Sequence, residues 1–164
     1  VVAPGTIFAI FSGIYFWFPK ISGKMLNETL GKIHFYFSFI FMNGIFWPML
    51  IQGLGGVSRR LADGGASYAH AQEFLHLNVI MSYSAWLLAI AQIPFIYNLI
   101  ITLIKVKKSK PDTNPWKVTT IEWTETTSPP LGHGNFAKIP VVYRGPYEYS
   151  VPGEKSDFTP QTQN

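Results

Sequence analysis

Three long apolar stretches, separated by short polar segments, occupy the first two thirds of the chain. They predict transmembrane helices over about residues 1–18, 31–52 and 71–105, because a helix needs about 20 apolar residues to cross a bilayer. The first stretch is at the short limit for a span. The third is longer than a bilayer requires, so its first turns are expected outside the hydrocarbon. The predicted fold is an all-α membrane protein in which these three helices belong to a larger helical bundle.

Local signals refine the predicted helices. Asn27 followed by Glu28 predicts an N-cap and a favourable acidic first turn for the second helix. Asn43 is a lone amide inside that helix and predicts a hydrogen bond to a neighbouring helix. Pro94 lies within the third apolar stretch, where it removes a backbone donor and predicts a kink.

Residues 111–164 are polar and rich in proline, which predicts an extended tail with little regular structure. The aromatic residues of this tail indicate that it packs along other protein surfaces. Lysines follow the first and third apolar stretches, so the positive-inside rule places the tail on the cytoplasmic or matrix side. The chain then begins on the outer side without a polar leader, and we expect further helices of the same protein to precede it.

Composition narrows the class of protein. Hydrophobic residues make up 48% of the chain and charged residues only 13%, about half the charged share of a soluble domain. There is no cysteine, which excludes disulfides and thiolate metal sites in this chain. The net charge is +4, but the lysines flank apolar stretches and form no basic stripe, so a nucleic-acid partner is not indicated.

The candidate site is a glycine-rich turn over residues 53–60 that ends in Arg59 and Arg60. Glycines allow a sharp turn and close approach to a partner. A guanidinium binds carboxylate or phosphate through a planar fork of donors, so two adjacent arginines indicate a partner with two anionic groups. They fall on the outer side, against the positive-inside rule, which favours an engaged pair. The alternative is that they anchor lipid head groups.

The second apolar stretch is more aromatic than lipid contact requires, since it holds Phe35, Tyr36, Phe37, Phe39, Phe41, Phe46 and Trp47. Packing within a bundle would explain this, and so would the wall of a flat apolar cofactor with anionic arms, such as haem. The histidines are His34, His70, His76 and His133, and none has the spacing of a self-contained metal site. His34 is expected to cap or hydrogen-bond at the start of the second helix.

Several short motifs occur in a fixed order along the chain: Val1-Val2-Ala3-Pro4-Gly5-Thr6, Trp17-Phe18-Pro19, Leu26-Asn27-Glu28-Thr29, Gly31-Lys32-Ile33-His34-Phe35, Asn43 to Pro48, Gly53-Leu54-Gly55-Gly56 to Arg59-Arg60, Asn114-Pro115-Trp116, Thr120-Ile121-Glu122-Trp123, Ser128-Pro129-Pro130 and Tyr143-Arg144-Gly145-Pro146-Tyr147-Glu148-Tyr149. In order and spacing they resemble subunit I of the haem-copper terminal oxidases, of the cytochrome c oxidase type. The resemblance covers essentially the whole chain.

The resemblance implies the end of the tenth helix, the eleventh and twelfth helices, and the inner-side tail of that subunit. It implies a proton-pumping enzyme that reduces dioxygen to water, with two haems of the A type and copper held by ligands on preceding helices. Arg59 and Arg60 are then expected to bind the haem propionates. The residues expected to line the low-spin haem pocket are Val2, Ile7, Phe11, Met42, Ile45 and Phe46. Ala3 stands where some members have serine, so pathways proposed there do not transfer.

The implied partners are the remainder of subunit I, subunits II and III, cytochrome c and membrane lipid. The implied location is a bacterial plasma membrane, with the mitochondrial inner membrane as the alternative. A ubiquinol oxidase of the same superfamily is the nearest competing interpretation. A non-enzymatic membrane scaffold or transporter fragment is the second, and it predicts no haem near the arginine pair.

Overall fold

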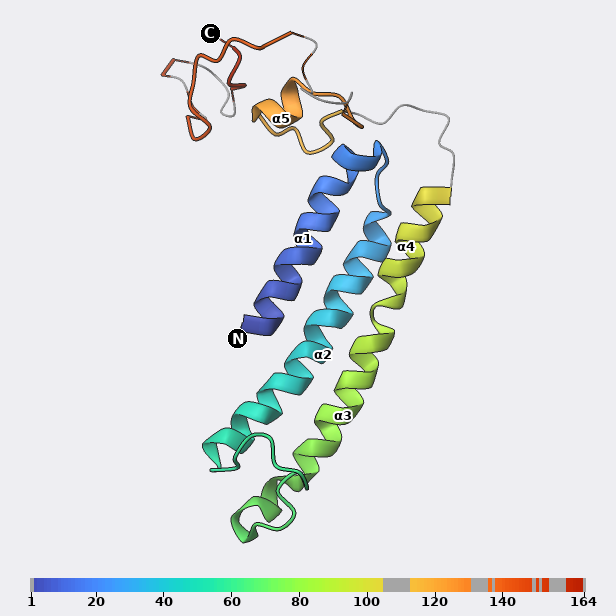
Figure 1. Ribbon diagram of the computed structural model, residues 1–164, viewed down its shortest axis with the longest axis vertical. Coiled ribbons are helices and arrows are strands. Elements are labelled where there is room, and N and C mark those ends of the chain that lie inside the picture. The colour runs from blue at the N-terminus through green and yellow to red at the C-terminus, as the bar shows by residue number, and fades with distance from the viewer. Residues whose placement is uncertain are drawn as a thin grey trace. The chain divides into compact units, whose positions relative to one another are not determined.

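The computed structural model describes residues 2–104, 113–130, 136, 138–148, 150, 152–153 and 159–163 (Figure 1). Within these residues all regular secondary structure is helical, and no strand occurs. The chain divides into two compact units, one formed by Val1–Leu26 with Thr102–Asn164 and the other by Asn27–Ile101. Each unit is described separately below.

The unit Asn27–Ile101 contains α2 (Glu28–Leu54), the 3-10 helix η1 (Ala69–Phe74), α3 (Leu75–Ile90) and most of α4 (Ile93–Ile104). Helices α2 and α3 pack along each other (Figure 1). A loop of residues 55–68, called the arginine loop below, connects α2 to η1.

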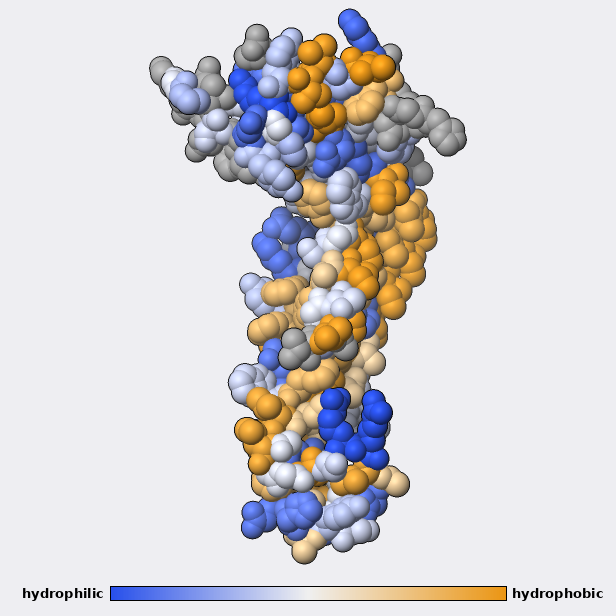
Figure 2. Space-filling model, turned by 60° about the vertical axis from the view of Figure 1, so that its left-hand side comes forward, coloured by the Kyte–Doolittle hydropathy of each residue, from blue (hydrophilic) through white to orange (hydrophobic). Residues whose placement is uncertain are grey.

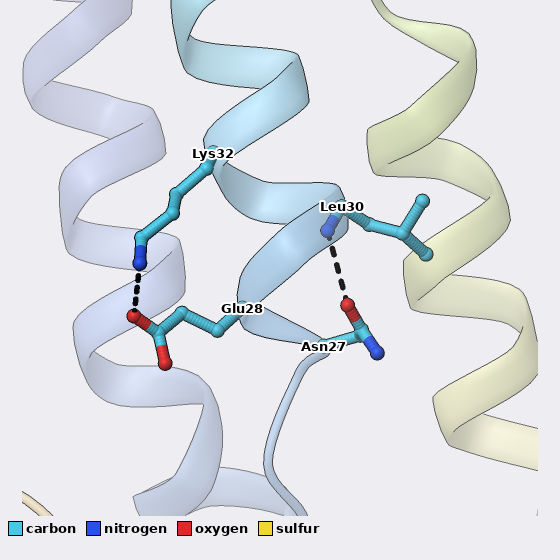
Figure 3. A network of polar contacts seen from close by, with 4 residues as sticks. All are labelled: Asn27, Glu28, Leu30 and Lys32. Carbon is cyan, nitrogen blue, oxygen red and sulfur yellow. Dashed lines mark hydrogen bonds and ion pairs between the residues drawn. The ribbon is translucent and has the colours of Figure 1, made fainter.

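The predicted cap of α2 is confirmed. The Oδ1 of Asn27 accepts a hydrogen bond from the Leu30 N–H at 3.0 Å, which satisfies one of the free donors at a helix start (Figure 3). The exposed carboxylate of the next residue, Glu28, lies 2.7 Å from the ammonium of Lys32, one turn further along the helix (Figure 3). The helix therefore begins three residues earlier than the expected span.

The side chain of Asn98 joins the start of α2 to α4. Its Oδ1 accepts from the Asn27 N–H at 2.8 Å, and its Nδ2 donates to the Asn27 carbonyl at 2.9 Å. Asn98 is 1% exposed, so this paired contact is shielded from solvent, where amide hydrogen bonds hold most firmly.

The predicted kink at Pro94 is confirmed as a break between two helices. Helix α3 ends at Ile90, residues 91 and 92 form a turn, and α4 begins at Ile93. The interruption lies just before Pro94 because proline has no N–H to donate to the carbonyl four residues earlier, at Ile90, and its ring clashes with that carbonyl in a regular helix.

Gln92 fixes this break against α2. Its Nε2 donates to the Leu88 carbonyl at 3.0 Å and to the Ser38 hydroxyl at 3.2 Å, while its Oε1 lies 3.0 Å from His34 Nε2. Since the Gln92 amide donates through Nε2, its Oε1 accepts and His34 Nε2 carries the proton. The expected hydrogen-bonding role of the buried His34 is confirmed.

The expected role of Asn43 is wrong. Its Nδ2 donates to the Phe39 carbonyl at 2.8 Å, and its Oδ1 accepts from Trp47 Nε1 at 2.9 Å. Both partners lie four residues away on α2 itself, where helical periodicity brings them beside Asn43. The amide is thus satisfied within its own helix.

The other unit contains α1 (Val2–Ser22) and the short α5 (Ile121–Thr124). Helix α1 continues through Pro19, beyond the expected end of the first span. Trp116 Nε1 donates to the Phe16 carbonyl at 3.0 Å, and the fully buried Trp123 contacts the rings of Phe16 and Trp17. Trp116 and Trp123 of the tail therefore pack on α1, whereas the division into a membrane part and an inner-side tail stays a prediction.

Two segments are long and apolar enough to cross a membrane: Glu28–Leu54, with 27 residues, and Ala69–Ile104, with 36. Large hydrophobic side chains remain exposed along them, among them Tyr36, at 61% exposed, and Trp86, at 69%. Figure 2 shows hydrophobic residues, in orange, at the surface of the helical part of the molecule. Such surfaces fit contact with lipid or further helices. A third span over residues 1–18 stays a prediction, and the lysines at 105–110 and His133 lie outside the described residues.

Candidate anion-binding loop

The glycines after α2 allow the arginine loop to turn back sharply. The Gly55 N–H donates to the Ile51 carbonyl at 2.9 Å, and the Val57 N–H to the Gln52 carbonyl at 3.0 Å. A Cβ on Gly55 would collide with the ring of Phe74 at the end of η1. At Gly55 the turn therefore lies close against the chain's own η1, and a larger residue would force the Phe74 ring to move.

Arg59 and Arg60 lie in the turn that follows, and both side chains are exposed. The φ angle of Arg60 is +64°, in the left-handed region that non-glycine residues rarely adopt. Residues held in this way cluster at functional sites. Among the described residues, neither guanidinium has a hydrogen bond or an ion pair. The backbone is therefore ordered while both cations are available to a partner.

The carboxylate of Asp63 is used inside the loop. Its Oδ1 accepts from the Gly65 N–H at 2.9 Å, and its Oδ2 from the Ser67 N–H at 2.8 Å. Hydrogen bonding with the Ser67 side chain, followed by these backbone donors, lowers the pKa of Asp63 from 3.8 to about 2. This acid orders the turn and forms no ion pair with the arginines.

Two amide side chains hold the loop to the helices. Gln52 Nε2 donates to Asn78 Oδ1 at 2.8 Å and to the Phe74 carbonyl at 3.1 Å. Asn78 Nδ2 donates to the Gly64 carbonyl at 3.0 Å. Neither residue was predicted to take part in the site, since the only signal in the sequence was an amide near the end of one apolar stretch and another near the start of the next.

The expected pocket residues divide between the two units. Val2, Ile7 and Phe11 lie on α1, where the first two are exposed and the third is half-buried. The remaining three lie on α2 at spacings of three and four residues and so share one face: Met42, which is buried, and Ile45 and Phe46, which are half-buried. Whether all six line one haem pocket stays a prediction.

Within the part of the chain that the structure describes, no three histidine or acidic side chains come together in a way that could hold a metal ion. His70 and His76 are both exposed. The arrangement instead fits an anionic organic group. Two unpaired guanidiniums on an ordered loop can donate planar forks to carboxylates and neutralise them.

Residues 1–87 match the family described as Cytochrome C and Quinol oxidase polypeptide I. The chain is 42% identical over 163 residues to the alternative cytochrome c oxidase subunit 1 of Bradyrhizobium diazoefficiens, a match that covers 99% of this chain and 27% of the relative. It is 43% identical over 157 residues to cytochrome c oxidase subunit 1 of Synechocystis, covering 96% and 27%. For the subunit of Thermostichus vulcanus the identity is 40%, covering 92% and 26%. The chain thus spans about a quarter of the length of these relatives.

Proposed function

This chain belongs to the cytochrome c and quinol oxidase polypeptide I family, and from that premise we propose that it forms part of the catalytic subunit of a proton-pumping cytochrome c oxidase. The oxidase would reduce dioxygen to water with electrons from cytochrome c. The names of the similar proteins support this choice over a ubiquinol oxidase, because each is called a cytochrome c oxidase subunit.

The single observation that carries the role of this chain is the exposed, unpaired arginine pair on an ordered loop. In our proposal Arg59 and Arg60 bind the propionates of the two haems and neutralise them. Neutralisation favours binding of an anionic group in a partly dehydrated site, and it raises the reduction potential because nearby positive charge favours the added electron. The haems, when bound, carry the electrons for dioxygen reduction. The six expected pocket residues supply apolar walls.

Further parts of the proposal concern the assembly. Copper and the haem ligands are expected on other helices of the subunit, and subunits II and III and cytochrome c are the expected partners. Family membership and two long apolar helices place the chain in a membrane protein. We propose a bacterial plasma membrane with the tail on the cytoplasmic side, since the relatives named above are bacterial.

A visible difference spectrum, reduced minus oxidised, of the purified complex containing this chain tests the class of enzyme. A-type haem bands with a component sensitive to carbon monoxide are expected. An intact complex without haem would leave the arginines as lipid anchors and refute the oxidase proposal.

Redox titration of the same complex tests the arginine pair. Arg59→Ala and Arg60→Ala should each leave the complex assembled and lower the midpoint potential of a haem. Lys32→Ala is the matched control, because it removes an exposed cation near the other end of α2, roughly 33 Å away along the helix at 1.5 Å per residue. Unchanged haem potentials in both arginine variants would contradict the assignment.

A further inference from the structure

Hydrogen bonds hold both ends of the backbone segment that carries the arginine pair. At residue 57 the backbone N–H donates to the Gln52 carbonyl at 3.0 Å, and at residue 64 the backbone carbonyl accepts from Asn78 Nδ2 at 3.0 Å. The six residues between these points, 58–63, contain Arg59 and Arg60. The position of both guanidiniums therefore depends on where these two hydrogen bonds hold the backbone.

The two residues that hold the segment, Gln52 and Asn78, also form a hydrogen bond with each other. Gln52, which is 8% exposed, donates from Nε2 to Asn78 Oδ1 at 2.8 Å. Asn78 thereby uses both ends of its amide, accepting from α2 and donating to the loop. A Cβ on Gly64 would lie 3.1 Å from Asn78 Nδ2, so the loop backbone also sits close against this side chain.

We propose that Asn78, oriented by Gln52, is a positioning residue that fixes the arginine pair relative to the ends of α2 and α3. The inference rests on the proposed function, in which the anionic partner is the pair of haem propionates. A guanidinium on a loosely held backbone spends less time beside its anion, and solvent then screens more of its charge. The pair raises the haem potential fully only while its loop is held.

Loss of the Asn78 side chain should leave the fold intact. Gly64 is exposed, so water can replace the lost donor to its carbonyl, and Gln52 Nε2 keeps its bond to the Phe74 carbonyl. The expected consequence is a change in how the arginines are placed, without a change in the helices.

The test is a double-mutant cycle on the purified oxidase complex, read out as haem midpoint potentials. Asn78→Ala should lower the potential in the same direction as Arg60→Ala and by a smaller amount. In the double variant Asn78→Ala/Arg60→Ala the shift should be smaller than the sum of the two single shifts, because Asn78 acts partly through Arg60. Ser82→Ala is the control, since it removes only the side-chain hydrogen bond to the Asn78 backbone carbonyl, one turn along α3, and leaves the Asn78 amide side chain in place.

A wild-type potential in Asn78→Ala, or fully additive shifts in the double variant, would overturn the inference. Asn78→Leu keeps a similar side-chain volume without either hydrogen bond. If Asn78→Ala lowers the haem content of the complex, the haem potential of Asn78→Leu is compared with that of the wild type instead. If Arg60→Ala shifts the potential while both Asn78 variants leave it unchanged, only this inference fails. If Arg59→Ala and Arg60→Ala both leave the haem potentials unchanged, the proposed function itself fails.

Discussion

The Lys20 side chain in one unit and the Arg59–Arg60 pair in the other are all cationic, but Lys20 is buried and hydrogen-bonded whereas the arginines are exposed. Lys20 is 5% exposed, donates to the Thr126 carbonyl at 2.9 Å, and has its ammonium 5.2 Å from the centre of the Trp123 ring. The arginines are exposed and have no partner within the described residues, although the side chains of Asp63 and Asn78 and several backbone hydrogen bonds hold their loop.

The difference separates a structural cation from one that is available for binding. A buried ammonium needs a hydrogen-bond acceptor and gains from an aromatic face, so its interactions are used up inside the protein. An exposed guanidinium contributes little to folding on its own. An ordered backbone beneath two free cations is therefore explained better by an external anion than by stability.

The largest expected effect is on the structural side of this comparison, at Trp123. This residue is fully buried, and its Nε1 has no hydrogen-bond partner within the described residues, so its ring acts through packing. Trp123→Ala should lower the local free energy of opening by about 3–5 kcal/mol, the usual cost of removing a buried large aromatic side chain. Hydrogen exchange of residues 114–130 in the purified complex measures this change.

Tyr147→Ala is the control for that measurement, because Tyr147 belongs to the same unit and is 83% exposed. It should leave exchange at residues 114–130 as in the wild type. Equal exchange in the Trp123 and Tyr147 variants would mean that the tail is not held by Trp123.

An intermediate effect is expected from the same neutral substitution in both units. Lys20→Met leaves the buried Thr126 carbonyl without its donor and should cost about 1–3 kcal/mol of local stability. Arg60→Met should stay within about 0.5 kcal/mol of the wild type, as surface substitutions usually do. Hydrogen exchange of each unit measures both values, and a reversed order would break the distinction drawn above.

Local signals in the sequence were sufficient for the features that depend on near neighbours. Asn27 caps α2 because its side chain reaches an N–H three residues away, and Pro94 interrupts its own helix. The same reasoning could have placed Asn43 correctly, since Phe39 and Trp47 lie one turn before and after it. The interhelical hydrogen bond predicted for Asn43 was wrong because it relied on the general preference of amides in membrane helices for a neighbouring helix.

Features that depend on the path of the loop could not be predicted. Gln52 and Asn78 are 26 residues apart, and they meet only because the arginine loop brings α3 back beside the end of α2. Composition and spacing identified the arginine pair as the candidate site. They did not indicate which side chains hold it, because those contacts follow from the tertiary structure.

The smallest expected effect concerns Asp63, whose carboxylate orders the second half of the arginine loop. Its pKa is lowered in the folded chain, from 3.8 to about 2, so its contribution is fully present above about pH 4 and is lost as the pH falls towards 2. Asp63→Asn keeps one acceptor oxygen and should expose the amides of Gly65 and Ser67 to faster hydrogen exchange at neutral pH. The difference from the wild type should shrink as the pH is lowered from about 5 towards 3, because the carboxylate of the opened loop, whose pKa is the ordinary 3.8, binds a proton and opening becomes more favourable. Comparison of the two proteins at each pH cancels the intrinsic pH dependence of exchange. A difference that stays constant over this range would show that the charge of Asp63 does not hold the loop.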